Sequence, residues 1–312
     1  MTQTYARGEF AEKLAHRVKH RGNPVVVGLD PRWENLPTSL KTTDDEPSPA
    51  VRAEAFTKFC QEVIDVVADM VPAVKPQAAF FEQLGPSGMY ALADVVQYAR
   101  SRGLLVVLDG KRNDIGSTAS AYADAYLGES SVWQSDALTV SPYLGDDSLT
   151  PFVDVAARRG AGIFVLVKTS NPGGGQFQDL TASGHTIFQH VAHHVEALAN
   201  KTKGASGYGI VGAVVGATYP AQLAELRGQM PSAWILVPGY GSQGATARDV
   251  AGAFDEHGLG AIVNSSRGII FAHENRRYAG RFAPAVWQDA VRLAAQDMID
   301  ELRAETTAGN LG

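Results

Sequence analysis

Three ionisable residues follow an apolar run in the first half of the chain, in the order Asp109, Lys111 and Asp114. The run, residues 104–108, is typical of a strand buried on both faces in a parallel sheet. Side chains two apart on a strand project to the same side, so we expect Asp109 and Lys111 to meet where this strand ends. A lysine set between carboxylates keeps its proton and a defined position, which favours proton chemistry. A structural ion pair that only closes a strand would show the same spacing.

Two further charged residues stand at the ends of predicted strands. Asp30 closes the run 25–29, and Lys75 stands at the end of the next strand. Active sites of α/β folds are built at the C-terminal ends of the strands. Two acids and two lysines on three consecutive strand ends can hold one another ionised in a partly dry cavity. This arrangement favours a single array of charges around one cavity at the C-terminal ends of the strands, and disfavours separate ion pairs.

Short apolar runs alternate with amphipathic stretches along most of the chain. The expected strands are residues 24–29, 73–76, 104–108, 137–140, 162–167, 210–215, 234–237 and 261–263. The expected helical stretches between them are 51–70, 87–101, 149–158, 186–198, 220–227 and 245–257. About eight β–α units of this spacing predict an α/β fold, a closed (β/α)₈ TIM barrel. No GxGxxG follows the first strand, which disfavours a dinucleotide-binding fold.

The expected organisation is a single barrel domain over residues 1–312 with two extended loops, at about 31–50 and 168–184. The first loop is rich in proline and acidic residues and is interpreted as a surface insertion. The second follows the fifth strand at the catalytic end and contains the glycine-rich segment 171–175 (NPGGG), which is typical of a lid. The tail, residues 306–312, is expected to be disordered.

The composition and charge of the chain indicate which kinds of binding partner and which cellular compartment to expect. The net charge of -6 and a sequence pI near 5.8 disfavour nucleic acid and membrane surfaces, so a small-molecule substrate is expected. Cys60 is the single cysteine, so no disulfide can form within the chain and a buried thiol is expected. Residues 1–21 lack the apolar core of a signal peptide, and no run of about eighteen apolar residues occurs. We therefore expect a cytoplasmic protein.

A second constellation lies near the C-terminus, after the seventh and eighth expected strands. Residues 238–244 (PGYGSQG) and 264–268 (NSSRG) are two loops of the kind that grip phosphate in barrel enzymes. Glycines such as Gly244 and Gly268 expose backbone N–H groups, and an arginine adds a bidentate charged contact. We expect Gln243 and Arg267 to face a phosphate group of the substrate.

These motifs together resemble the orotidine 5'-phosphate decarboxylase family, in particular its longer bacterial type 2 branch, over about residues 25–272. The anchors are residues 109–118 (DGKRNDIGST) for the family's DxKxxDI signature, Lys75, the loop 238–244 and Arg267. The resemblance implies a lyase that decarboxylates orotidine 5'-phosphate to uridine 5'-phosphate, the last step of de novo pyrimidine nucleotide synthesis. It also implies a homodimer with sites at the subunit interface, and no metal or organic cofactor.

The resemblance assigns the charged residues to the chemistry. Lys111 would deliver a proton to C6 of the pyrimidine as CO₂ leaves, and Asp109 would lie beside the departing carboxylate. Lys75 and Asp30 would order the charge array and bind the ribose hydroxyls. Loss of CO₂ leaves a localised carbanion with no carbonyl placed to accept its charge. An adjacent ammonium group can stabilise that charge and then protonate the carbon.

Binding roles follow by the same resemblance. Asp114, Ile115 and Thr118 would reach into the site of the neighbouring subunit. Ser170 would hold the pyrimidine ring, and Gln243 with Arg267 would bind the phosphate. The loop after Ser170 is longer and richer in glycine than in shorter members of the family, so the pyrimidine contacts there are left open.

Three other functions remain open on the sequence alone. DxKxxD also serves magnesium-dependent sugar-phosphate decarboxylases and aldolases of the same barrel superfamily. A non-catalytic barrel that binds a nucleotide as a sensor is the second alternative, although an intact set of Asp109, Lys111 and Asp114 disfavours it. The third is a Schiff-base aldolase, for which a lysine held charged between acids is a poor nucleophile.

Overall fold

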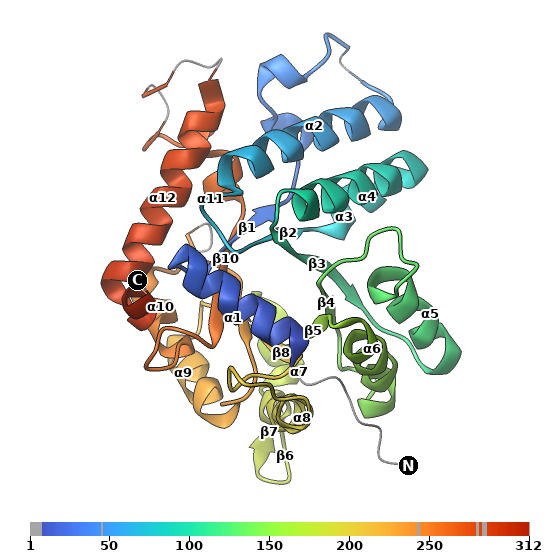
Figure 1. Ribbon diagram of the computed structural model, residues 1–312, viewed down its shortest axis with the longest axis vertical. Coiled ribbons are helices and arrows are strands. Elements are labelled where there is room, and N and C mark those ends of the chain that lie inside the picture. The colour runs from blue at the N-terminus through green and yellow to red at the C-terminus, as the bar shows by residue number, and fades with distance from the viewer. Residues whose placement is uncertain (1–7, 45, 242–243, 279–280, 283–285, 312) are drawn as a thin grey trace.

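Eight parallel strands close into a barrel in the computed structural model of the chain, which describes residues 8–44, 46–241, 244–278, 281–282 and 286–311 (Figure 1). The order around the barrel is β1-β10-β9-β8-β5-β4-β3-β2, so each strand lies beside its neighbour in sequence once the small hairpin β6–β7 is set aside. The predicted (β/α)₈ TIM barrel is confirmed. The strands are β1 (Val25–Leu29), β2 (Ala73–Pro76), β3 (Leu105–Arg112), β4 (Ala137–Val140), β5 (Gly162–Lys168), β8 (Val211–Val215), β9 (Ile235–Val237) and β10 (Ala261–Ser265).

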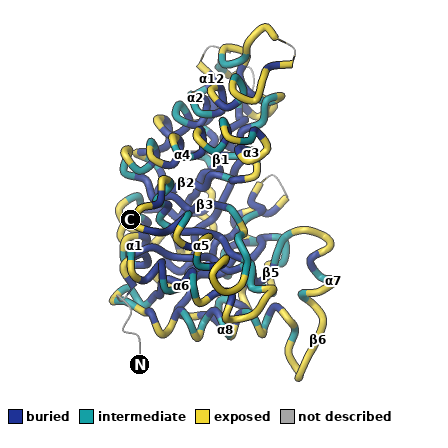
Figure 2. Tube along the Cα trace, turned by 90° about the vertical axis from the view of Figure 1, so that its right-hand side faces the viewer, coloured by how far each residue is buried: buried dark blue, intermediate teal, exposed yellow. Residues whose placement is uncertain are grey.

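The strands are buried on both faces, which explains why they stand out in the sequence as apolar runs. Every residue of β1, β4, β8 and β10 is buried, and the strands form the dark centre of Figure 2. The expected end of the third strand at residue 108 is wrong, because β3 continues through Arg112. Pairing of Arg112 with Val140 keeps the polar end of β3 in the sheet, and apolar patterning carries no signal for that.

Helices surround the barrel, as Figure 1 shows. They are α1 (Glu9–Arg21), α2 (Pro49–Val67), α3 (Ala78–Glu82), α4 (Gly85–Ser101), α5 (Gly116–Leu127), α6 (Asp146–Arg159), α7 (Gly175–Gln178), α8 (Ile187–Lys201), α9 (Pro220–Gln229), α10 (Ala247–Val250), α11 (Arg267–Ile270) and α12 (Trp287–Glu305). The helix expected over 245–257 is instead α10 followed by a 3-10 turn, Ala251–Ala253. Among the described residues, no helix combines the length and apolarity needed to cross a membrane.

Helix α1 closes the N-terminal end of the barrel. The ring of Phe10 packs edge-on against Phe164 of β5, with 6.0 Å between the ring centroids. Gly162, the first residue of β5, has no room for a side chain, because a Cβ there would lie 2.2 Å from a carbon of the Phe10 ring. The opposite end, where the strands finish, is therefore the end left for a site.

The connection from β5 to α8 is the extended loop of the catalytic end. It contains the 3-10 turn Pro172–Gly174, helix α7 and a hairpin of β6 (Thr181–Ala182) and β7 (His185–Thr186). In Figure 2 the stretch from α7 to β6 projects from the barrel and is largely exposed. The other long connection, from β1 to α2, holds two 3-10 turns, Trp33–Asn35 and Thr38–Leu40.

The expected disorder of the tail, residues 306–312, is wrong for its described part. Residues Thr307–Leu311 form a 3-10 helix, and Ala308 is fully buried. The hydroxyl of Thr307 donates a hydrogen bond of 2.7 Å to the carbonyl of Asp255. A short stretch of small residues gives no sequence signal for such docking, because the contacts come from a distant loop.

Candidate active site

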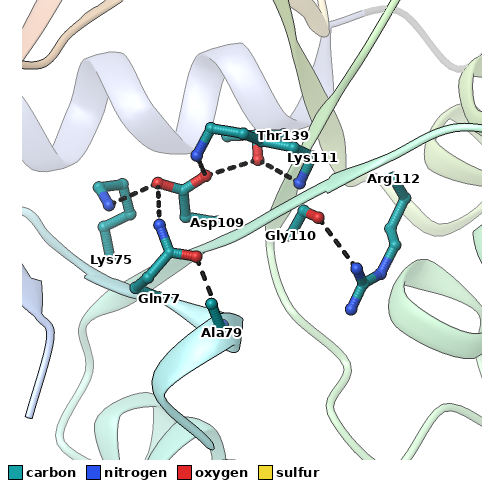
Figure 3. A network of polar contacts seen from close by, with 8 residues as sticks. All are labelled: Lys75, Gln77, Ala79, Asp109, Gly110, Lys111, Arg112 and Thr139. Carbon is teal, nitrogen blue, oxygen red and sulfur yellow. Dashed lines mark hydrogen bonds and ion pairs between the residues drawn. The ribbon is translucent and has the colours of Figure 1, made fainter. Parts of the chain in front are cut away.

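The carboxylate of Asp109 lies at the centre of a polar network at the C-terminal ends of β2, β3 and β4 (Figure 3). Its Oδ1 accepts hydrogen bonds from Lys111 Nζ at 2.6 Å and from Thr139 Oγ1 at 2.9 Å. Its Oδ2 accepts from Lys75 Nζ at 2.8 Å and from Gln77 Nε2 at 3.0 Å. The structure thus brings Lys75, Asp109 and Lys111 together at one point.

The way in which Asp109 and Lys111 come to face each other differs from simple strand alternation. The ladder between β3 and β4 is irregular: Leu108 pairs with Leu138 and Arg112 with Val140, so three residues stand opposite Thr139 alone. Within this bulge Lys111 adopts a left-handed backbone with φ of 46°. Such a backbone is uncommon for a residue other than glycine and costs on the order of 1–3 kcal/mol. Bulges of this kind re-aim a side chain next to active sites.

Burial and charge set the protonation states of the buried pair. The side chains of Lys75 and Asp109 are 5% and 11% exposed, whereas that of Lys111 is 47% exposed. Burial alone would raise the pKa of Asp109, but the charges of Lys75 and Lys111 outweigh it and hold that pKa well below its usual range. Burial alone would lower the pKa of Lys75, but the charges of Asp109 and Asp30 outweigh it and raise that pKa. Both groups are therefore charged at neutral pH.

A cavity of about 430 Å³ opens beside this network. It is lined by Lys75, Asp109, Lys111, Thr139, Leu166, Thr169, Ser170, Asn171, Val214, Leu236 and Pro238. The lining combines the charged groups, aliphatic side chains of β5, β8 and β9, and residues of the loop that follows β5. A mostly apolar pocket with a few convergent polar groups is the usual form of a small-molecule site. Ser170 lies in it, as expected from its position after the fifth strand.

A second cavity, of about 390 Å³, adjoins the loops after β9 and β10. Arg267 and Gly268 line it, as does Gly241 of the loop that follows β9. Gly244 is exposed at the end of that loop, with a left-handed φ of 91° that favours glycine. The predicted phosphate ligand Gln243 lies outside the described residues. Arg267, Gly268 and the loop after β9 are thus neighbours at one edge of the barrel.

Asp30 stands at the end of β1, beside the network and not in contact with it. Its charge contributes to the raised pKa of Lys75 and, with burial as the larger cause, to the raised pKa of the Cys60 thiol. Asp30 forms no ion pair with Lys75 in the described chain. Its buried Oδ1 has no hydrogen-bond partner among the described residues, and such an oxygen is suited to a substrate hydroxyl.

Three further predicted site residues lie after β3 and are also absent from the lining of the 430 Å³ cavity. Asp114 and Ile115 lie on the loop after β3, and Thr118 is exposed in the first turn of α5. Asp114 Oδ1 accepts a hydrogen bond of 2.8 Å from the backbone N–H of Ile115, a residue that is 56% exposed. Among the described residues that line the 430 Å³ cavity, none of the three is present.

Sequence reasoning missed two members of the network, Gln77 and Thr139. Gln77 follows Lys75 by two residues, and its side chain also accepts from the N–H of Ala79 in the first turn of α3. Thr139 is the one polar residue in the buried run of β4, and its hydroxyl also accepts from the backbone N–H of Lys111 at 2.9 Å. A polar residue inside an apolar strand was the available signal for Thr139, because a buried hydroxyl needs a partner.

Comparison with known protein families identifies the wider group. The family model described as "Orotidine 5'-phosphate decarboxylase / HUMPS family" matches residues 23–282. Among curated proteins, the chain is 57% identical over 298 residues to the orotidine 5'-phosphate decarboxylase of Rhodopirellula baltica, covering 94% of this chain and 99% of that one. It is 43% identical over 289 residues to the enzyme of the same name from Deinococcus radiodurans, covering 91% and 97%.

A solved structure is also similar. The OMP decarboxylase of Leishmania donovani superposes with a TM-score of 0.73 at 33% sequence identity, covering 95% of this chain and 98% of that one. The likeness therefore extends over nearly the whole of both chains.

Proposed function

Because this chain belongs to the orotidine 5'-phosphate decarboxylase family, we propose that the cavity beside Lys111 is where it converts orotidine 5'-phosphate to uridine 5'-phosphate and CO₂. The enzyme is a carboxy-lyase of pyrimidine nucleotide biosynthesis. The observation that carries the site is the Asp109 carboxylate held between two ammonium groups, one buried and one half exposed at the cavity.

Lys111 is the proton donor in this proposal. The bond between C6 and the carboxylate breaks, CO₂ leaves, and the electron pair stays on C6. Lys111 Nζ then gives a proton to C6, forming the C–H bond of the product, and solvent reprotonates the amine. Its ammonium group can approach the substrate because its side chain is 47% exposed and, among the described residues, its one ion pair is with Asp109 at 2.6 Å.

Asp109 and Lys75 hold that donor ready before substrate arrives. Lys75, almost fully buried, fixes one oxygen of Asp109, while the other oxygen fixes Lys111. Because these charges are already in place, they need not reorganise as the carbanion forms. Such electrostatic preorganisation is the largest contribution to the rate enhancement of many enzymes. We assign the rate gain to this preorganisation and not to repulsion between Asp109 and the substrate carboxylate.

The remaining groups place the substrate. Leu166, Val214 and Leu236 offer apolar contact to the faces of the pyrimidine, and Ser170 offers a hydroxyl to its edge. Asp30, with its unpaired buried oxygen, binds a ribose hydroxyl. The phosphate binds at the loops after β9 and β10, to Gln243, Gly244, Arg267 and Gly268. Binding energy far from C6 can be used to orient the reacting carbon.

A decarboxylation assay tests this function directly. The purified chain is mixed with orotidine 5'-phosphate, and the loss of substrate absorbance is followed with and without EDTA. We expect turnover that EDTA leaves unchanged, because both oxygens of Asp109 already accept from ammonium groups and the carboxylate is poorly placed to hold Mg²⁺. No turnover of this substrate would refute the proposal.

The second candidate is a magnesium-dependent sugar-phosphate decarboxylase or aldolase, because the matched family model also covers the HUMPS group. Turnover of a sugar phosphate that EDTA abolishes would favour it. Turnover of any phosphorylated substrate would exclude a non-catalytic, nucleotide-sensing barrel.

We further propose that the enzyme is a homodimer in which Asp114, Ile115 and Thr118 complete the site of the neighbouring subunit. These residues are absent from the lining of their own cavity. Large exposed apolar residues lie nearby in sequence, on the loop after β3, on α5 and on the loop after β4: Ile115, Tyr122, Tyr143 and Leu144. Exposed large apolar groups rimmed by polar ones are typical of an interface. We also propose a cytoplasmic location, in keeping with a substrate and product that are both charged nucleotides.

Mixing two inactive variants tests the shared site. Lys111→Ala removes the donor from one subunit, and Asp114→Ala removes the residue that reaches across. In a hybrid dimer one site then has both residues intact, so an equal mixture refolded together should recover about a quarter of the unmodified activity by random assortment. Each variant alone serves as the control. A mixture no more active than its parts would place Asp114 in its own subunit.

A further inference from the structure

We propose that Lys168 is a positioning residue, whose ion pair with Asp179 holds the loop bearing Ser170 over the substrate cavity. The ion pair itself follows from the geometry of the loop, whereas its effect on substrate binding rests on the proposed function. Lys168 is the last residue of β5 and lies two positions before Ser170.

The ammonium group of Lys168 is buried in a defined setting. Its side chain is 1% exposed and pairs with the carboxylate of Asp179, which follows α7. The ring centroids of Phe188 and Tyr219 lie 5.2 and 5.0 Å from its Nζ. A buried charge is costly unless it is paired, and aromatic faces add attraction for a cation. Lys168 is absent from the described lining of the substrate cavity, so its charge serves the loop and not the substrate.

The adjacent pair of residues strengthens the same connection. The N–H of Thr169 donates to Gln178 Oε1 at 3.1 Å, and Gln178 Nε2 donates to Thr169 Oγ1 at 2.8 Å. Two residues at the end of β5 therefore hold two residues at the end of α7. We call these four residues, Lys168, Thr169, Gln178 and Asp179, the clasp. Closing a short loop in this way removes freedom that the chain would otherwise lose on binding substrate.

The glycine run inside the loop is explained by the clasp. A Cβ on Gly174 would lie 2.9 Å from Thr169 Oγ1, and one on Gly175 would lie 2.6 Å from Asp179 Oδ2. A Cβ on Gly173 would meet nothing closer than Asn171 Nδ2 at 3.7 Å. Gly174 and Gly175 are thus small because clasp side chains pack against them. The expected lid is held to the barrel in the described chain.

The clasp has a consequence for substrate affinity. Thr169, Ser170 and Asn171 follow Lys168 directly and line the cavity. If only a fraction of molecules held this segment in place, the apparent affinity for substrate would fall to that fraction of its full value. Saturating substrate would still draw the segment into place. Loss of the clasp should therefore raise KM and leave kcat nearly unchanged.

The ion pair is tested with Lys168→Met, Asp179→Asn and the double variant in the full-length enzyme. We expect each single variant to raise KM by about tenfold with kcat within about threefold, and the double variant to add little more. Lys168→Met leaves no unpaired buried charge, because the Asp179 side chain is 46% exposed and can be solvated. A merely structural role would lower the amount of active enzyme, and hence apparent kcat, at unchanged KM. That result would overturn the proposal.

Two alanine variants of the glycine run form a matched pair. Gly175→Ala should push the Asp179 carboxylate away from Lys168 and raise KM as Asp179→Asn does. Gly173→Ala, two positions away, is the control and should leave KM unchanged. Equal effects of the two substitutions would mean that the loop responds to any added side chain, which contradicts a role for the clasp.

Hydrogen exchange separates this inference from the proposed function. The amides of residues 169–179 should exchange at least about tenfold faster in Lys168→Met, which leaves no unpaired buried charge, than in the unmodified protein, with the β4 amides unchanged. Unchanged protection of residues 169–179 would overturn the clasp whether or not the enzyme turns over orotidine 5'-phosphate. Failure of the unmodified enzyme to turn over that substrate would refute the function alone.

Discussion

Replacing Lys111 by alanine is expected to lower kcat by about 10⁴-fold or more, because the substitution removes both the acid and the charge beside the developing carbanion. General acid catalysis is worth about 10²- to 10⁴-fold, and one well-placed electrostatic group adds about 10²-fold or more. The measurement is single-turnover decarboxylation of orotidine 5'-phosphate, with product affinity determined separately by titration with uridine 5'-phosphate.

Product binding distinguishes lost chemistry from lost structure. The phosphate loops stand on β9 and β10, away from β3, so Lys111→Ala should still bind uridine 5'-phosphate within about tenfold of the unmodified affinity. Alanine at 111 also keeps a left-handed backbone that is strained for any residue with a side chain. Lys201→Ala, at an exposed lysine near the end of α8, is the control and should keep full kcat. Near-normal turnover by Lys111→Ala would remove Lys111 from its role.

The barrel was predictable because its strands are buried on both faces. Such strands read as short apolar runs, and eight of them at regular spacing leave few alternatives to closure. The polar end of β3 was not predictable, because Asp109 to Arg112 are held in the sheet by pairing with β4 and by the hydroxyl of Thr139. Those partners are about 30 residues away in the chain, and a local pattern does not contain them.

The candidate site also has parts that the sequence predicts and parts that it does not. The contact between Asp109 and Lys111 followed from spacing, although the backbone achieves it through a bulge. The role of Gln77 was not predictable from its local sequence, because it depends on the position of Asp109 on the next strand. The glycine-rich segment 171–175 is typical of a lid, and the structure adds that Gly174 and Gly175 make room for clasp side chains. A glycine-rich composition indicates that an isolated segment would be flexible. Only the tertiary contacts show whether the segment stays flexible in the folded protein.

Asp109→Asn should have the second large effect, lowering kcat by about 10³-fold or more and destabilising the fold by about 3–5 kcal/mol. The amide carries no charge to balance two ammonium groups, and Lys75, at 5% exposure, loses its ion-pair partner among the described residues. The double variant Lys75→Met/Asp109→Leu separates these effects. Replacing a buried ion pair by apolar residues of similar size is often neutral, so stability should return while kcat stays low because Lys111 has lost its anchor. Recovery of kcat in the double variant would contradict the assignment of Asp109.

The pH dependence of the same substitution follows from the direction of the pKa shifts. The pKa of Asp109 is lower in the folded protein than in the unfolded chain, so its stabilisation is present above about pH 4 and is lost as the pH falls further. The pKa of Lys75 is raised, so its stabilisation is lost only as the pH rises above about 10.4. Asp109→Asn lacks the acid-sensitive contribution of the carboxylate, so the difference in unfolding free energy between the unmodified enzyme and this variant should shrink as the pH falls below about 4. Urea unfolding at about pH 7 and about pH 3 measures it. An equal difference at both values would mean that Asp109 gains nothing from its two lysines, and the charge array would then lose its physical basis.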